Sequence, residues 1–259
     1  TNLRLEADDA IGASDRHLSL SVATVTAHST GTNSAGIYLT EDNAITVNTV
    51  AVTVTDFNAN ASTTDVTDAS QSDLVSGNNG NIVLVATLGD VTLNDGTDAD
   101  GTAISANGSG SVLIDSVAGN VTANADILSD TGHITVKADL AMTLNANVNV
   151  VTASTGTISL DAEGGALTMV GSTNVEATGS SLRVAASNDI VLGNLTATNV
   201  SVITTGGAIS NASGTTMNVT ATKVRLEADD AIGASGNRLT LDVDTVSATS
   251  TGTTRAGIY

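Results

Sequence analysis

The chain has 259 residues, of which 41% are hydrophobic, yet it contains only one Phe, two Tyr and no Trp. Its formal net charge of −19 argues against nucleic acid as a partner, because phosphate groups are bound by clustered Lys and Arg. The absence of Cys excludes disulfides and thiolate metal sites, and no apolar run has the length of a transmembrane helix, so we expect no membrane insertion by this segment.

The opening segment of the chain is repeated at its other end. Residues 1–38 align without a gap with residues 222–259, and 26 of the 38 positions are identical. The two copies are therefore offset by 221 residues. This predicts that residues 1–221 form one full period of a tandem array and that residues 222–259 begin the next period, continuous with the first.

Short segments of alternating apolar and polar residues recur along the chain. Each starts with an apolar, a polar and an apolar residue, and a second apolar residue follows eight or nine positions after the first, beyond a polar turn. The period of two predicts strands, and the Gly, Asn and Asp residues between them predict tight turns. In chain order, the segments begin at residues 3, 37, 82, 112, 134, 158, 182, 200 and 224.

Units of this length are too short to bury their own apolar face, so neighbouring units must stack and bury it together. We therefore predict an all-β fold, a parallel β-helix with about nine rungs per 221 residues. Ile158, Leu160 and Ala162 are expected to point inward, and Ser159 and Asp161 outward. Parallel rungs lie about 4.8 Å apart, which predicts a rod of about 40–45 Å per period. The rival fold, a β-sandwich, normally needs a bulky aromatic residue in its core.

Two polar stretches interrupt this pattern, and loops of a solenoid often carry its binding sites. The candidate binding loops are residues 56–80 and 94–101, although they are equally compatible with insertions that have no partner. Within the second loop, Asp95, Asp98 and Asp100 are the candidate metal ligands, because Ca²⁺ requires oxygen ligands on a sharply turning loop. The EF-hand pattern does not fit, since no closing Glu follows, and a solvated acidic turn is the alternative.

The sequence contains no convincing catalytic motif. His17, His28 and His133 fall in separate units of the strand pattern, where surface polar positions explain them better than general bases do. Paired carboxylates can hydrolyse sugars, but sugar sites usually include aromatic side chains, which are nearly absent here. We therefore predict that the chain is not an enzyme and needs no cofactor, with Ca²⁺ as a candidate metal ion.

Two segments, "GTISLDAEGGALT" and "GHITVKADLAMT", resemble the repeats of filamentous-haemagglutinin-like exoproteins of the two-partner secretion route. The long unit, with "RLEADDAIG" and "GNIVL", is similar to the giant β-strand repeat surface proteins of Gram-negative bacteria. The resemblance covers essentially the whole chain. It implies a right-handed β-helical fibre, extracellular or on the cell surface, that acts in adhesion, aggregation or matrix formation.

The sequence is compatible with two classes of function. The first is a structural fibre whose partners are further copies of itself, through neighbouring repeats or association into filaments. The second is a carbohydrate- or Ca²⁺-binding module that uses residues 56–80 and 94–101, with a surface polysaccharide as its partner. Near-identity of these loops between adjacent repeats would favour the second class, and rapid divergence of the loops would favour the first.

Overall fold

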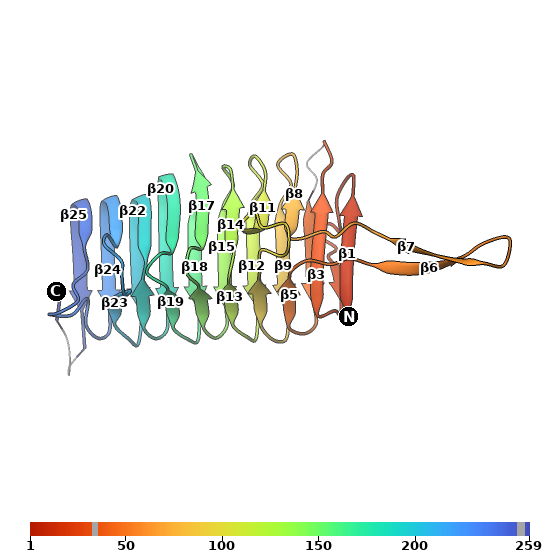
Figure 1. Cartoon of the computed structure of the whole chain (residues 1–259). Coiled ribbons are helices and arrows are strands. Elements are labelled where there is room, and N and C mark those ends of the chain that lie inside the picture. The colour runs from red at the N-terminus through yellow and green to blue at the C-terminus, as the bar shows by residue number, and fades with distance from the viewer. Residues whose placement is uncertain (33–35, 253–256) are drawn as a thin grey trace.

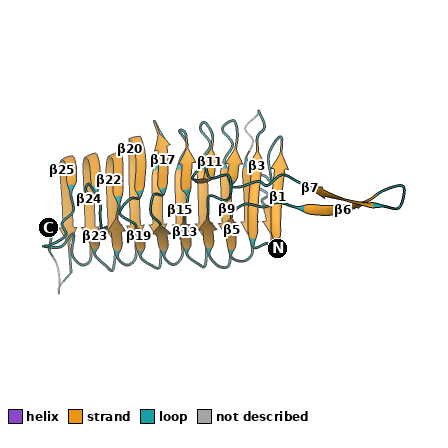
Figure 2. Cartoon of the chain, viewed as in Figure 1, coloured by secondary structure: helices purple, strands orange, loops and turns teal. Residues whose placement is uncertain are grey.

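A computed structural model describes residues 1–32, 36–252 and 257–259 of the chain. Twenty-three of its strands form one sheet, in which all strand pairings are parallel. Figure 1 shows the strands stacked along one axis, with the two ends of the chain at opposite ends of the stack. Figure 2 shows only strands and connecting loops, and no described helix has the length and apolar character needed to cross a membrane. The predicted parallel β-helix is confirmed.

The chain winds through three ladders of parallel strands, in the order first, second, third. The first ladder contains β4 (Ile37–Glu41), β9 (Ile82–Ala86), β12 (Val112–Ser116), β15 (Ile134–Ala138), β18 (Ile158–Ala162) and the C-terminal halves of β20 (Asn174–Ala186), β22 (Asn194–Thr204), β24 (Val219–Ala228) and β25 (Leu241–Ser250). The second ladder contains β5 (Ile45–Val47), β10 (Val91–Leu93), β13 (Val121–Ala123), β16 (Met142–Leu144), β19 (Leu167–Met169), β21 (Ile190–Leu192) and β23 (Ile209–Asn211).

The third ladder begins at the N-terminal end of the chain. It contains β1 (Asn2–Ala7), β3 (Thr24–Ser29), β8 (Leu74–Ser76), β11 (Thr102–Ala106), β14 (Asp126–Ser129), β17 (Asn149–Ala153) and the N-terminal halves of β20, β22, β24 and β25. The first two residues of β3, Thr24 and Val25, pair with Thr46 and Val47 of β5, so β3 also belongs to the second ladder at its start. A short strand, β2 (Leu18–Leu20), pairs with β4 in the first coil. In the last four long strands, the chain passes from the third ladder to the first without a break.

Alternation along each strand builds the core. In β18, Ile158, Leu160 and Ala162 are buried, whereas Ser159 and Asp161 are partly exposed, as predicted. Each inward side chain stacks on the inward side chains of the neighbouring coils, because the register keeps like positions in line. Small aliphatic side chains can fill the narrow interior at this spacing, which explains why so few aromatic residues are needed.

Glycines allow the coils to approach closely at the turn between the third and first ladders. A Cβ atom at Gly132 would lie 2.1 Å from the carbonyl oxygen of Gly110, and one at Gly156 would lie 2.4 Å from that of Gly132. Hydroxyl groups bind the same carbonyl oxygens: Ser129 Oγ donates to Gly110 at 2.8 Å, and Thr152 Oγ1 donates to Gly132 at 2.6 Å. This corner of the coil is therefore closed by a repeated pairing of a glycine with a hydroxyl group.

The two copies of the repeated sequence lie on different ladders. Leu5 belongs to the third ladder, and eight steps of strand pairing along that ladder lead to Val219. Leu226, the equivalent of Leu5, follows Val219 in β24 but pairs on the first ladder. Ile11 and Ile232 show the same shift, from the first ladder to the second. One period of 221 residues therefore makes eight and one third coils, close to the nine expected, with a rise of about 40 Å.

A hairpin extends past the N-terminal end of the stack (Figure 1). The sequence predicts a polar loop at residues 56–80, but the structure contains an antiparallel pair of strands that spans its first part, β6 (Thr53–Phe57) and β7 (Thr63–Thr67), followed by β8 of the third ladder. All residues of β6 and β7 are exposed, and Figure 1 shows the hairpin extending away from the other strands. The prediction was wrong because a fully exposed hairpin needs no inward apolar face, so its polar composition resembles that of a loop.

Candidate metal site

Acidic side chains from two neighbouring coils meet at the edge of the third ladder. Asp73, Asp98 and Asp100 each offer a carboxylate oxygen, and these oxygens all lie within 4.8 Å of one another. Asp73 directly precedes β8, whereas the other two belong to the loop before β11. Because Leu74 of β8 pairs with Ile104 of β11, the register of the ladder brings the two insertions together.

The structure revises the predicted ligand set of Asp95, Asp98 and Asp100. Asp98 and Asp100 lie together, but Asp95 is outside this group, and its Oδ1 atom accepts a hydrogen bond from the backbone N–H of Gly101 at 2.9 Å. Asp73, which completes the group, is missed by the sequence analysis because it lies one coil earlier. The alternation of residues shows which side chains point inward, but only the register between coils shows that these carboxylates are neighbours.

Asp73 is the buried member of the group. Its side chain is only 2% exposed, and its Oδ1 atom has no hydrogen-bond partner among the described residues. Its backbone carbonyl oxygen accepts hydrogen bonds from the N–H of Ala27 and from Thr26 Oγ1, both at 2.9 Å, which fixes the residue against β3. Burial, together with the negative charges of Asp98 and Asp100, raises the pKa of Asp73 to about 8. The ionised form of Asp73 is therefore unfavourable in this site unless a cation lies beside it.

The loop that carries Asp98 and Asp100 is held firmly against the neighbouring coil. The backbone N–H of Thr97 donates to Thr49 Oγ1 at 2.7 Å, and Thr49 Oγ1 lies 2.8 Å from Ser72 Oγ. Gly96 has a φ of +83°, and a Cβ atom there would lie 2.4 Å from Ser72 Oγ. Only glycine satisfies both the backbone angle and this close approach. The loop is therefore anchored before any ligand is bound.

The three histidines do not assemble into a site. His17 precedes β2 and His28 lies in β3 of the same coil, whereas His133 precedes β15, and each one has a local hydrogen-bond partner. His17 Nδ1 pairs with Thr40 Oγ1 at 2.9 Å, His28 Nε2 with the carbonyl oxygen of Ser72 at 2.7 Å, and His133 Nδ1 with Thr157 Oγ1 at 2.8 Å. The prediction that all three fall in separate units is wrong for His17 and His28, which share a coil.

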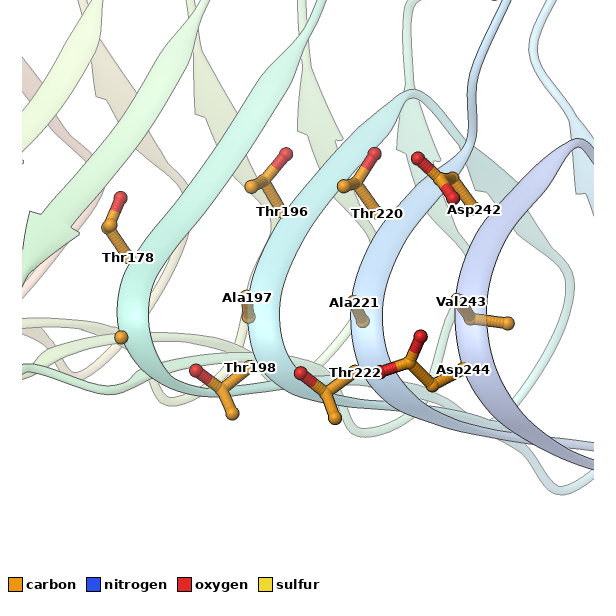
Figure 3. A pocket seen from close by; sticks show the side chains of 11 residues that line it. Thr178, Thr196, Ala197, Thr198, Thr220, Ala221, Thr222, Asp242, Val243 and Asp244 are labelled. Carbon is orange, nitrogen blue, oxygen red and sulfur yellow. The ribbon is translucent and has the colours of Figure 1, made fainter.

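An open depression near the C-terminal end is lined by rows of hydroxyl groups (Figure 3). It lies where β20, β22, β24 and β25 pass from the third ladder to the first, and the register aligns Thr196 with Thr220 and then with Asp242. Rows of hydroxyl and carboxylate groups can exchange hydrogen bonds with a polar polymer such as a polysaccharide. The residues that line the depression are Thr178, Gly179, Thr196, Ala197, Thr198, Thr220, Ala221, Thr222, Asp242, Val243 and Asp244.

Comparisons of the chain with protein-family models, with curated proteins and with solved structures found no match. The β-helical fold described above is established by the strand pairings of the chain itself.

Proposed function

We propose that the chain is a segment of the shaft of a secreted bacterial surface protein, a structural fibre that takes part in adhesion, aggregation or matrix formation. One observation carries this proposal. At each end of the stack, apolar positions are left uncovered, and the equivalent positions in the other copy of the repeated sequence are covered by a further coil.

The C-terminal end gives the first half of this argument. Val246 is 53% exposed and Ile258 is 55% exposed, whereas their equivalents in the first copy, Val25 and Ile37, are both 0% exposed. Val25 is covered because it pairs with Val47 of the following coil. Among the described residues, β25 pairs only with β24, so its outer edge has no such cover. A following period of the same sequence would supply it.

The N-terminal end gives the second half. Leu3 and Leu5 are partly exposed, whereas the equivalent Val224 and Leu226 are buried beneath β22, the preceding coil. At both ends, positions that a neighbouring coil covers in one copy of the repeated sequence are thus exposed or partly exposed in the other copy. Unpaired edge strands also favour association with further copies, because their N–H and C=O groups are free to pair. Continuation of the shaft and end-to-end self-association are both supported by this feature.

The outer surface suits a solvated shaft. On the first ladder, Asp115, Lys137 and Asp161 stand in register on successive coils. Lys137 Nζ lies 2.7 Å from Glu163 Oε1, and an exposed ion pair also joins Arg183 to Asp161 at 2.8 Å. Such exposed ion pairs contribute little to stability, about 0–1 kcal/mol each. Their main effect is to keep the exposed faces polar, and the high net negative charge acts in the same direction.

The test at the molecular level is electron microscopy of a recombinant array, with residues 1–221 present three times and residues 222–259 at the end. We expect a continuous rod that lengthens by about 40 Å for each added period. Separate globules joined by linkers would contradict the proposal.

A second experiment tests where the fibre acts. Antibodies raised against the chain are applied to intact cells that produce it, and to the same cells after lysis as a control. We expect surface filaments to be labelled on intact cells. Labelling that requires lysis would overturn the proposed location while leaving the fibre architecture untouched.

A further inference from the structure

We infer that Asp73, Asp98 and Asp100 form a binding site for a divalent cation, with Ca²⁺ preferred over Mg²⁺, and that the bound ion fastens together the two insertions at the base of the hairpin. The inference rests on the side chains of this site and does not depend on the proposed role of the chain as a shaft.

The buried oxygen of Asp73 is the first reason. A carboxylate that is removed from water normally finds either hydrogen-bond donors or a cation. Asp73 Oδ1 has no hydrogen-bond partner among the described residues, and the two carboxyl groups that lie beside Asp73, those of Asp98 and Asp100, are themselves acidic. A divalent cation between the three carboxylates would supply the missing partner and would also neutralise their mutual repulsion.

The form of the site favours Ca²⁺. Asp98 and Asp100 are exposed, so water molecules can complete the coordination shell on the solvent side. Ca²⁺ accepts six to eight oxygen ligands in irregular arrangements, whereas Mg²⁺ demands a nearly ideal octahedron. Carboxylates from two separate insertions, one of them fixed inside the coil, suit the more tolerant ion. The anchoring of the loop by Thr97 and Gly96 keeps the acidic side chains near one another before the ion arrives.

The ion would have a structural effect at a particular place. Asp73 lies between the hairpin and β8, and the loop at 94–101 leads into β11 of the next coil. A shared cation would therefore cross-link two consecutive coils where the chain returns from its longest excursion. We expect the hairpin base and the adjoining loop to exchange amide hydrogens more slowly when Ca²⁺ is bound.

The direct test is isothermal titration calorimetry of the full chain with CaCl₂ and, separately, with MgCl₂. We expect one Ca²⁺ ion per chain, with a dissociation constant of about 10⁻⁴ to 10⁻³ M, and weaker binding of Mg²⁺. Asp73→Asn and Asp98→Asn should each weaken Ca²⁺ binding at least tenfold. Asp56→Asn, which removes the same charge from the exposed strand β6, is the matched control and should bind like the unaltered chain.

Several results would overturn the inference. Absence of saturable Ca²⁺ binding, equal affinity for Mg²⁺, or unchanged binding in Asp73→Asn would each do so. If many ions bind weakly, and Asp56→Asn reduces this binding as much as Asp73→Asn and Asp98→Asn do, the acidic surface only attracts counterions. Asp98 is exposed, so Asp98→Asn should fold. This variant therefore keeps the test valid if Asp73→Asn fails to fold. Circular dichroism of each variant checks the fold.

Discussion

Val25 and Val246 occupy the same position in two copies of one sequence, yet Val25 is completely buried and Val246 is about half exposed. Val25 pairs with Leu3 on one side and Val47 on the other, whereas within the described part of the chain Val246 pairs only with Val224. The environment of a residue in this fold is thus decided by the coils above and below it.

This difference leads to a first prediction. Val25→Ala should lower the free energy of unfolding by about 2 kcal/mol, because it removes two buried methyl groups and leaves a cavity. Val246→Ala should cost less than about 0.5 kcal/mol in the same chain, because its side chain is already hydrated. Urea unfolding of both variants measures the difference. Equal costs at the two positions would contradict the burial described above.

The glycine corner gives a second prediction. Gly132→Ala should destabilise the chain by about 1–3 kcal/mol, since its new methyl group would meet the carbonyl oxygen of Gly110, a backbone atom that cannot move aside cheaply. Gly236→Ala is the control, because no atom of the other described residues lies within 4 Å of a Cβ atom there. Thermal melting should separate the two variants clearly. If both melt like the unaltered chain, the coils are not packed as closely at this corner as described.

A buried carboxyl group gives a third prediction, on pH. Glu41 is 0% exposed, and burial raises the pKa of its carboxyl group above the ordinary value of 4.5, although its oxygens accept hydrogen bonds from the N–H groups of Val22 and Asn43. Below pH 4.5 the folded and unfolded states are both protonated. As the pH rises beyond that value, the unfolded state releases its proton first, so the stability contributed by this group falls until the pH passes the folded-state pKa.

Glu41→Gln removes this titration. The stability of the variant relative to the unaltered chain should therefore rise as the pH is increased from about 4.5 towards neutrality. Melting temperatures of both proteins across this range measure the change, and the difference cancels the titration of the other acidic groups. A difference that stays constant with pH would show that Glu41 titrates normally.

The hairpin gives a fourth prediction. Replacing residues 54–66 by Asn-Gly should leave the melting temperature of the chain unchanged, because every residue of β6 and β7 is exposed. The backbone N–H of Asp68 already donates to the carbonyl oxygen of Val52 at 2.9 Å, so the two flanking segments are close enough for a tight turn. A large loss of stability would mean that the hairpin contributes to the shaft itself.

The sequence predicts the fold well because the solenoid is built from a local signal. Alternation in segments such as residues 158–162 identifies the strands and their inward side chains, and the shortness of each unit requires stacking. The rotation of Leu226 by one ladder relative to Leu5 could not be predicted in this way. Alternation does not reveal which face a strand occupies, and the insertions before β8 and β11 lengthen the chain without adding a coil.

The candidate site could be predicted only in part. Asp98 and Asp100 stand close together in the sequence, which predicts their association, but Asp73 joins them through the pairing of β8 with β11. Contacts of this kind depend on which coils are neighbours and on how far each insertion folds back. Asp95 also stands beside them in the sequence, but its side chain closes the loop by accepting a hydrogen bond from the backbone N–H of Gly101.

The most direct test of the account is cryo-electron microscopy of an array of three periods, with the hairpins as visible markers. The coil count predicts one hairpin about every 40 Å along the rod, each rotated by one ladder, about a third of a turn, from the one before. The fourth hairpin of a longer array would return to the first face. Hairpins aligned along a single face, or periods that fold as separate bodies, would contradict a continuous solenoid of eight and one third coils per period.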